Sequence, residues 1–227
     1  MNKHSQQNKT FFTKWNMDLR ESRFKRIIEL LVGEKPGKIL DVGCSSGDFV
    51  AGFADLGWEP FGLEISNQKV AEAKKKGVNC QVGDVSEELP FKDNTFKAII
   101  AGEIIEHLVD TDAFIKELHR ILKKDGVVII TTPNLASLEN RVRLLFGKYP
   151  RWVDYKIESY GHVRSYTPKA LKRHLTDNGF KVEAHTGNFI PPLSQEIGDD
   201  VKWPWLAKTG KIFPSLAMDI IMKARKP

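Results

Sequence analysis

Short apolar runs alternate with longer amphipathic segments through most of the chain. The short runs are rich in Val, Ile and Phe and stop at glycine or turn residues, which is typical of buried strands. Strands that alternate with helices are typical of a parallel sheet with helices on both faces. The strands expected on this basis are 38–42, 60–64, 79–82, 96–101, 126–132, 180–185 and about 217–223.

Helices are predicted between these runs from apolar spacing and from residues that begin and end helices. Ser66 and Thr111 are expected N-caps, and Thr167 followed by Pro168 is a further start signal. Glycines close several of these segments. The expected helices are 20–32, 48–56, 67–76, 112–122 and 168–178.

Two long connections interrupt the alternation. Residues 134–165 follow the fifth strand, and residues 186–215 separate the last two strands. Long connections in compact domains are often lids or binding loops. We expect a single domain over 1–227, made of an N-terminal helical segment (1–35), a cofactor-binding core (36–133), a lid-like insertion (134–166) and a final part of the sheet (167–227) with a substrate loop (186–215).

Composition limits the class of protein. The 227 residues, 41% apolar and 28% charged, suit one folded domain. The two cysteines, Cys44 and Cys80, are too few for a disulfide framework, and the first residues do not resemble a secretion signal. No apolar run approaches the roughly 20 residues that cross a bilayer. We therefore expect a cytoplasmic protein without a membrane span.

The net charge of +6 is concentrated in one part of the chain, since residues 139–173 hold nine basic and three acidic residues. Such a surface attracts anionic partners, or it keeps a helix solvated, and both interpretations stay open. An apolar helical stripe lies at its start: Leu138, Val142, Leu145 and Phe146. The stripe predicts either packing against the sheet or peripheral contact with an anionic membrane through 138–152.

The strongest chemical signal is a strand, a glycine turn and the start of a helix, in ILDVGCSSGDF from Ile39 to Phe49. Backbone N–H groups of such a turn can face a ligand at close range. Glu64 ends the next expected strand, 21 residues after Gly43. A carboxylate there can bind both hydroxyls of a ribose, so the pattern predicts an adenosine derivative.

The ligand is not expected to be a dinucleotide or a nucleoside triphosphate. Ser45 and Asp48 stand where the dinucleotide motif has its second and third glycines, and no Walker-type lysine follows. Asp41 and Asp48 would repel a pyrophosphate, whereas they suit an ammonium group such as that of S-adenosylmethionine. A dehydrogenase remains an alternative only if the glycine spacing is misleading.

The order and spacing of four segments match a known family: ILDVGCSSGDF, FGLEIS, GDVSEELPFKDNTFKAIIAGEIIEHL and LKKDGVVIITTPN. From about Ile39 to Asn134, the chain resembles the class I S-adenosylmethionine-dependent methyltransferases, and more narrowly the ubiquinone and menaquinone biosynthesis methyltransferases. The resemblance implies an α/β fold, a Rossmann-like three-layer sandwich. Its seven-stranded, mostly parallel sheet would have an antiparallel last strand.

The resemblance also implies S-adenosyl-L-methionine as the cofactor and gives roles to particular residues. Ser46 departs from the family, many members of which have glycine there. The implied set comprises Asp41, Gly43, Cys44 and Gly47 at the methionine end, Glu64 at the ribose, Asp84 and Val85 at the adenine, and Glu103 and Ile104 on the sulfonium side, together with Ser45 and Ile65.

Three residues are candidates for the chemical step: His107, His162 and Glu106. A hydroxyl acceptor must lose a proton, and an imidazole with its ordinary pKa near 6.5 suits a general base at neutral pH. Each histidine has a structural role as its alternative. Some relatives bind a divalent cation through an acid-rich loop here, which makes Glu103, Glu106 and His107 an alternative ligand set, but we expect no metal.

The residues after the fourth strand limit the acceptor. Methyltransferases acting on amide or amino nitrogens commonly carry an Asn/Asp-Pro-Pro-aromatic turn here, whereas this chain has Ala101-Gly102-Glu103-Ile104. An oxygen or carbon of a small molecule is therefore favoured. The tail, including GHVRSYTPKALKRHL, also resembles methyltransferases of sugar and lipid biosynthesis, which points to an anionic, lipid-linked or glycan precursor. An RNA methyltransferase and a non-catalytic S-adenosylmethionine-binding subunit are the alternatives, although no RNA-binding module is evident.

Overall fold

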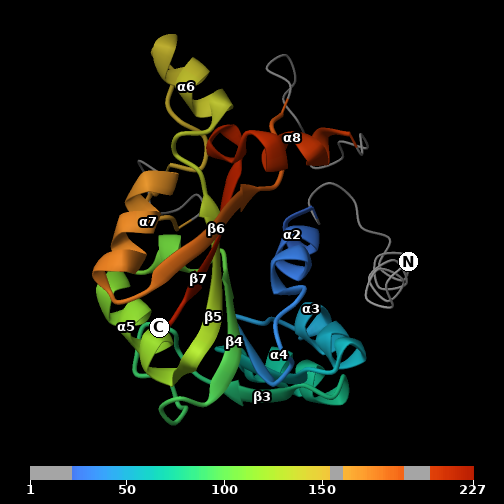
Figure 1. Cartoon of the computed structure of the whole chain (residues 1–227). Helices are drawn as coiled ribbons and strands as arrows, with labels where there is room; N and C mark the ends of the chain where they lie inside the picture. Colours follow the sequence, from blue (N-terminus) through green and yellow to red (C-terminus); the bar gives the residue numbers. More distant parts are fainter. Residues whose placement is uncertain (1–21, 154–160, 192–204) are drawn as a thin grey trace, which may run out of the picture.

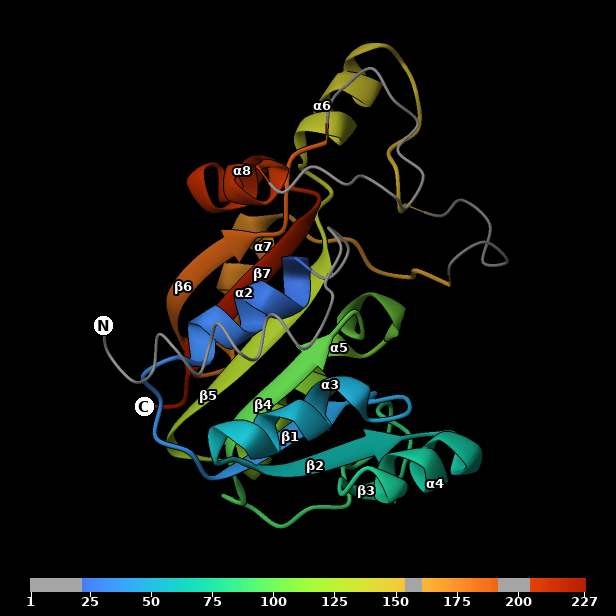
Figure 2. The same ribbon diagram turned by 90° about the vertical axis from the view of Figure 1, so that its right-hand side faces the viewer.

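A seven-stranded sheet runs through the computed structural model, which describes residues 22–153, 161–191 and 205–227. The strand order is β3-β2-β1-β4-β5-β7-β6, and helices cover both faces of the sheet (Figures 1 and 2). The expected three-layer α/β arrangement is therefore confirmed. Parts of the predicted N-terminal segment, insertion and substrate loop, at 1–21, 154–160 and 192–204, lie outside the described residues.

All seven predicted strands are present, and β7 alone among them runs antiparallel to its neighbours, β5 and β6. β5 begins at Leu122 rather than at Gly126, because Leu122 pairs with Phe96 across an irregularity in the register. The strands are β1 (Lys38–Val42), β2 (Glu59–Glu64), β3 (Asn79–Val82), β4 (Phe96–Gly102), β5 (Leu122–Pro133), β6 (Lys181–Gly187) and β7 (Asp219–Arg225).

The predicted helix 48–56 divides into an α-helix and a 3₁₀ segment at Gly52. Within the described ranges, no helix combines the length and apolarity needed to cross a bilayer. The helices are α2 (Ser22–Leu31), α3 (Asp48–Ala51), η1 (Gly52–Leu56), α4 (Asn67–Lys75), η2 (Ile105–His107), α5 (Thr111–Ile121), α6 (Leu138–Leu145), α7 (Pro168–Asp177), α8 (Leu206–Ile212) and η3 (Pro214–Leu216).

Helix starts follow local capping chemistry, with one correction to the prediction. Ser66 and Thr167 cap α4 and α7 through their side-chain hydroxyls, as expected. Asp110 caps α5 instead of Thr111, because Asp110 Oδ1 accepts the Ala113 N–H at 2.9 Å. Thr111 lies in the first turn of that helix, where its side chain is buried.

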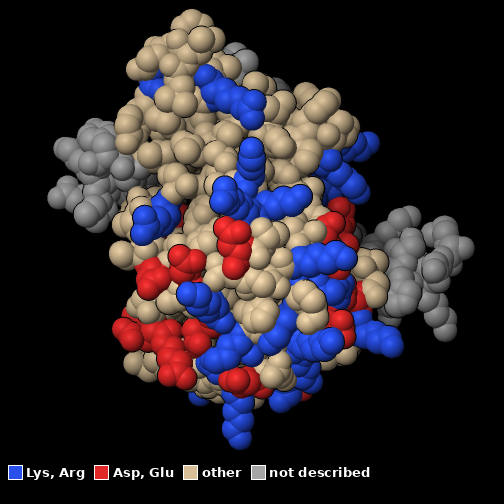
Figure 3. All heavy atoms as spheres, turned by 60° about the vertical axis from the view of Figure 1, so that its left-hand side comes forward, with Lys and Arg blue, Asp and Glu red and all other residues tan. Residues whose placement is uncertain are grey.

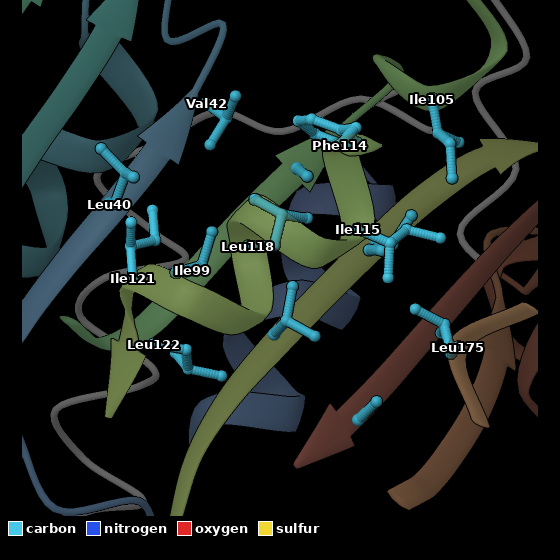
Figure 4. Close-up of a cluster of buried hydrophobic side chains, with 14 of the residues drawn as sticks. Leu40, Val42, Ile99, Ile105, Phe114, Ile115, Leu118, Ile121, Leu122 and Leu175 are labelled. Carbon is cyan, nitrogen blue, oxygen red and sulfur yellow. The ribbon is translucent and has the colours of Figure 1, made fainter. Parts of the chain in front are cut away.

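Two apolar cores lie on opposite faces of the sheet. On one face, α5 and α7 pack against alternate residues of the central strands, such as Leu40, Val42 and Ile99 (Figure 4). On the other face, α2, α3 and α4 pack against the intervening residues, such as Ile39 and Ile100. A strand that is buried on both faces has apolar residues at consecutive positions, which explains the short continuous apolar runs in the sequence. The central strands therefore hold the carboxyl edge of the sheet rigidly.

Gly62 is the tightest position in β2. A Cβ there would collide with Cys44 Sγ and would lie 3.0 Å from Cys80 Sγ. We expect Gly62→Ala to lower the free energy of unfolding by about 1–3 kcal/mol, because the overpacked side chain displaces its neighbours. Denaturant unfolding followed by circular dichroism measures the change.

Cys44→Ala provides the matched control for that substitution. Removing the Cys44 sulfur takes away the nearest obstacle, so Gly62→Ala should cost less stability in the Cys44→Ala background. Equal costs in both backgrounds would contradict this account of the contact.

Candidate active site

The predicted ligand turn follows β1 and contains three residues with positive φ. Gly43 and Gly47 have φ of 73° and 74°, and Ser45 has φ of 48°. A side chain at Gly43 would also place its Cβ 2.5 Å from Ile104 Cδ1. The positive φ therefore favours glycine at this position, and a Cβ would also displace the end of the Ile104 side chain.

Glu64 braces the turn from the end of β2. Its Oε2 accepts the Ser45 N–H at 3.0 Å, and its Oε1 accepts the Ser66 N–H at 2.9 Å. The Gly43 N–H also donates to Leu63 O, at 2.8 Å. The carboxylate is thus held beside the turn, in the place where the sequence predicts a ribose-binding acid.

Cys44 points its side chain into the core beneath the turn. It is buried, and its Sγ lies 3.5 Å from the Sγ of Cys80. Burial raises the pKa of the Cys44 thiol, which disfavours the thiolate. Cys44 therefore offers its backbone to a ligand rather than a nucleophilic sulfur.

Asp41 and Glu103 bring two carboxyl groups to the same edge of the sheet. Asp41 is 8% exposed, and burial raises its pKa to about 7 against the opposing charge of Arg23. Glu103 follows β4 with a positive φ of 56°, and its Oε1 lies 3.1 Å from Arg23 Nη1. The Thr131 hydroxyl donates to the same oxygen at 2.7 Å.

Arg23 is a site residue that the sequence analysis missed. It lies on α2, far from the glycine turn along the chain, and its guanidinium reaches the carboxyl edge of the sheet. A basic residue on the polar side of an amphipathic helix carries no signal of a ligand site. Only the packing of α2 across the sheet brings Arg23 to Glu103.

The residues predicted for the adenine and sulfonium sides lie at the same edge. Asp84 and Val85 follow β3, and Asp84 Oδ1 accepts from the Ser86 N–H at 2.8 Å and its hydroxyl at 2.7 Å. Ile65 follows β2 and is 66% exposed, and Ile104 packs over the glycine turn. The structure thus places the whole predicted cofactor set at or just after the carboxyl ends of β1 to β4.

The three predicted catalytic residues form a second group next to this edge. Glu106 and His107 lie on η2, and His162 belongs to the insertion. The rings of His107 and His162 are 4.8 Å apart between centroids. The insertion is tied down here, because the Glu106 carbonyl accepts the Val163 and Arg164 N–H groups at 2.8 and 3.0 Å.

Each histidine has a defined hydrogen bond on Nδ1. His107 Nδ1 lies 3.2 Å from the Gly161 carbonyl, and His162 Nδ1 lies 2.9 Å from the Trp152 carbonyl. A carbonyl oxygen only accepts, so each Nδ1 carries the hydrogen. In the neutral ring, Nε2 then holds the lone pair that can take a proton or bind a cation.

Glu106 is a buried carboxyl group, 1% exposed. Its Oε2 accepts from the Thr132 hydroxyl at 3.1 Å, and its Oε1 has no hydrogen-bond partner among the described residues. Burial, reinforced by the nearby Glu103 charge, raises the pKa of Glu106 to about 8. The group is therefore mainly protonated at neutral pH.

A pocket opens between this group and the insertion. His162, Arg164 and Glu106 line it together with residues of β5 and of the chain that follows α6. Its complete lining is Glu106, Thr132, Pro133, Leu135, Arg151, Trp152, Val153, His162, Arg164 and Ser165.

The structure brings together a different set of possible metal ligands from the set that the sequence suggested. Glu106, His107 and His162 offer ligand atoms within 4.8 Å of one another, among the described residues. Glu103, which the sequence suggested as a ligand, is held by Arg23 and Thr131 instead. Two imidazoles and one carboxylate could hold a divalent transition-metal ion.

Comparison with known proteins identifies the family. A family model described as a methyltransferase domain matches residues 17–185. The chain belongs to this methyltransferase family. The bovine mitochondrial ubiquinone biosynthesis O-methyltransferase is 25% identical to it over 190 residues, which cover 80% of this chain and 50% of the bovine protein. A demethylmenaquinone methyltransferase from Chlorobaculum tepidum is 34% identical over 111 residues, 48% of this chain and 46% of that protein.

A solved methyltransferase structure agrees with the fold. The S-adenosylmethionine-dependent methyltransferase of Archaeoglobus fulgidus superposes with a TM-score of 0.65 at 18% identity, over 96% of this chain and 98% of that one. The chain spans about half the length of the first curated relatives it matches. It thus carries the methyltransferase domain of this family and shares the Rossmann-like fold of that structure.

The carboxyl edge of this methyltransferase fits its cofactor chemically. A side chain at Gly43 would be strained by the positive φ and would displace the end of the Ile104 side chain. Glu64 would hold the ribose hydroxyls, while Asp41 and Arg23 would complement the ammonium and carboxylate of the methionine part. A paired acid and base suit an amino-acid zwitterion better than they suit a pyrophosphate.

The buried acids give the methyltransferase a stability that depends on pH. The pKa values of Asp41 and Glu106 are raised to about 7 and about 8. Between pH 4 and these values, these two acids and Asp219, whose pKa burial also raises to about 7, bind more protons in the folded protein than in the unfolded chain. Their contribution to the free energy of unfolding therefore falls as pH rises. His119 and His185, whose pKa values burial lowers, act in the opposite direction on a smaller number of groups. We expect the cofactor-free protein to melt at a lower temperature at pH 8 than at pH 5.5.

Two variants separate this effect from general charge repulsion. Asp41→Asn removes one of the buried acids, so the fall in melting temperature should become shallower. Glu88→Gln changes an exposed acid and should leave the slope unchanged. A wild-type protein that is more stable at pH 8 than at pH 5.5 would contradict the assignment.

Proposed function

We propose that the protein transfers a methyl group from S-adenosylmethionine to a hydroxyl oxygen on a small aromatic ring. The pocket bounded by Glu106, Trp152 and His162 carries the proposal. It lies against the loop that begins at Glu103, on the carboxyl edge where the cofactor set gathers. The names of the relatives, a ubiquinone biosynthesis O-methyltransferase and a demethylmenaquinone methyltransferase, support a hydroxylated ring.

The pocket lining favours an aromatic, anionic acceptor. The Trp152 indole offers an apolar face, and Arg164 adds a positive charge to the wall beside Arg151, which is paired with Glu139. The Arg151 guanidinium lies 5.5 Å from the centre of the Trp152 ring. An acceptor that combines a flat ring with a carboxylate would use both features.

His162 is the proposed general base. Its Nδ1–H donates to the Trp152 carbonyl, so in the neutral ring Nε2 is the atom that would take the proton of the acceptor hydroxyl. His162 lines the pocket, whereas His107 lies beside it. His107 therefore serves to position the His162 ring.

Glu106 is proposed to orient the acceptor. In its protonated form, the carboxyl O–H at the unpartnered Oε1 can donate a hydrogen bond to an acceptor oxygen. A neutral Glu106 also leaves His162 as the group that accepts the proton. Bound S-adenosylmethionine supplies an electrophilic methyl group on a sulfonium.

Formation of S-adenosylhomocysteine tests the proposal. With 3,4-dihydroxybenzoate as the probe, we expect product formation and a mass increase of one methyl group on oxygen. The control 3,4-dimethoxybenzoate has no free hydroxyl and should give none. Turnover on bulk tRNA but not on the dihydroxybenzoate, or cofactor binding without turnover on either, would replace this function with one of the two alternatives.

Chelation separates proton transfer by His162 from metal assistance. Because the proposed base needs no cation, turnover should be unchanged after dialysis against EDTA. A loss of more than about tenfold that Mg²⁺ or Zn²⁺ restores would contradict the base mechanism. It would assign Glu106, His107 and His162 to a metal site instead.

A further inference from the structure

Large apolar side chains are exposed on two helices at one end of the molecule. At the end of α6, Leu144, Leu145 and Phe146 are 56%, 79% and 72% exposed. At the end of α8, Ile212 and Phe213 are 65% and 57% exposed. Both helices lie at the carboxyl edge of the sheet, beyond β5 and β6, in both views of the ribbon (Figures 1 and 2).

The way α6 is anchored explains its exposed tip. Asn140 is buried, and its side chain bonds to the Asn134 carbonyl at 3.2 Å and to the Arg151 N–H at 2.7 Å. These bonds fix the first half of the helix. The second half projects from the body of the molecule, so consecutive apolar residues there have no core to pack against (Figures 1 and 2). Of the two alternatives for the apolar stripe, the packing of Leu145 and Phe146 against the sheet is therefore excluded.

Basic residues outnumber acidic ones around these apolar side chains, although Glu29 of α2 lies 3.9 Å from Lys211. In the described stretches 134–153 and 205–216, six residues are basic and one is acidic. That acid, Glu139, lies 3.3 Å from Arg151 and 3.6 Å from Arg143. Figure 3 shows the end formed by α6 as mostly uncharged, with basic side chains beside and below it and acidic ones only further away.

We propose that this surface, the exposed apolar residues of α6 and α8 with the basic residues around them, docks on an anionic lipid bilayer. The apolar side chains would enter the headgroup layer, and Lys148 and Lys208 would meet lipid phosphates. A projecting tip with separate apolar points suits a deformable lipid surface better than the groove of a protein. Few acidic residues lie on this surface, so few protein carboxylates would be repelled by the anionic lipid headgroups.

Docking in this orientation has a consequence for the pocket. Leu135 and Arg151, which flank α6, also line the pocket. The bilayer would then lie close to the pocket wall. The docking inference does not depend on the proposed reaction, because vesicle binding requires no turnover.

Sedimentation with vesicles tests the inference. The vesicles contain phosphatidylcholine alone or phosphatidylcholine with 30% phosphatidylglycerol. We expect at least tenfold tighter binding to the anionic vesicles, and weaker binding in high salt. Leu145→Gln with Phe146→Gln should reduce binding to the anionic vesicles at least tenfold, and Lys148→Ala with Lys208→Ala should remove the preference for anionic lipid.

Val32→Gln is the matched control. Val32 is 49% exposed and follows α2, in the connection that leads to the amino end of β1, whereas α6 follows the carboxyl end of β5. Its replacement should leave vesicle binding unchanged. Circular dichroism and the affinity for S-adenosylhomocysteine show that each variant is folded. Equal binding to both kinds of vesicle, or no effect of the α6 substitutions, would overturn the inference, as would self-association through α6 without lipid binding.

Discussion

Replacing His162 by alanine is expected to lower turnover on 3,4-dihydroxybenzoate by about 10²–10⁴-fold, the usual contribution of a positioned general base. The loss should appear in kcat, because His162 takes a proton only during the reaction. The affinity for S-adenosylhomocysteine should be unchanged, because His162 lines the acceptor pocket and does not belong to the glycine turn that holds the cofactor. Steady-state kinetics and calorimetry measure the two effects separately.

A second substitution identifies the atom responsible. His162→Asn keeps an N–H close to the position of Nδ1, so the bond to the Trp152 carbonyl can persist. It removes Nε2, and turnover should fall as far as in the alanine variant. Substantial recovery in His162→Asn would mean that His162 acts through its structural bond alone.

Replacing Glu64 by alanine is expected to weaken S-adenosylhomocysteine binding by about 10–100-fold, which corresponds to roughly 1–3 kcal/mol for a lost hydrogen bond to a charged group. Two causes act together. The ribose loses its carboxylate partner, and the Ser45 and Ser66 N–H groups lose their acceptor, which loosens the turn. Isothermal titration calorimetry gives the affinity directly.

Glu59→Ala is the matched control for Glu64. Glu59 begins the same strand and is exposed at the opposite edge of the sheet. It should bind S-adenosylhomocysteine as the wild type does. An unchanged affinity in Glu64→Ala would show that the acid after β2 does not contact the ribose, and would remove the central element of the cofactor site.

The cofactor edge could be predicted because its signals are local in the sequence. A strand followed by Gly43 requires a tight turn, and an acid at the end of the next parallel strand must lie beside it. The antiparallel placement of β7 came from the resemblance, and the register in the structure confirms it. The cap of α5 could not be predicted in the same way, since Asp110 and Thr111 are adjacent and can both cap, and only the structure shows that Asp110 accepts the Ala113 N–H.

The grouping of Glu106, His107 and His162 depends on contacts that no local sequence pattern contains. His107 and Gly161 are separated by 54 positions in the chain, yet the ring of one bonds to the carbonyl of the other. Arg23 reaches Glu103 from a helix that precedes the core. Contacts between residues so distant in the chain follow from how the helices and the sheet pack. Several arrangements of the insertion would be compatible with the same sequence pattern.

The sequence by itself determined the α/β architecture, the glycine turn and the acid of β2, because hydrophobic periodicity and turn geometry act over a few residues. The tertiary structure alone decided that Arg23 joins the cofactor edge, that Glu106 is buried with a raised pKa, and that the tip of α6 projects into solvent. Burial and proximity depend on the path of the whole chain, and with them the protonation state and the exposure of each group.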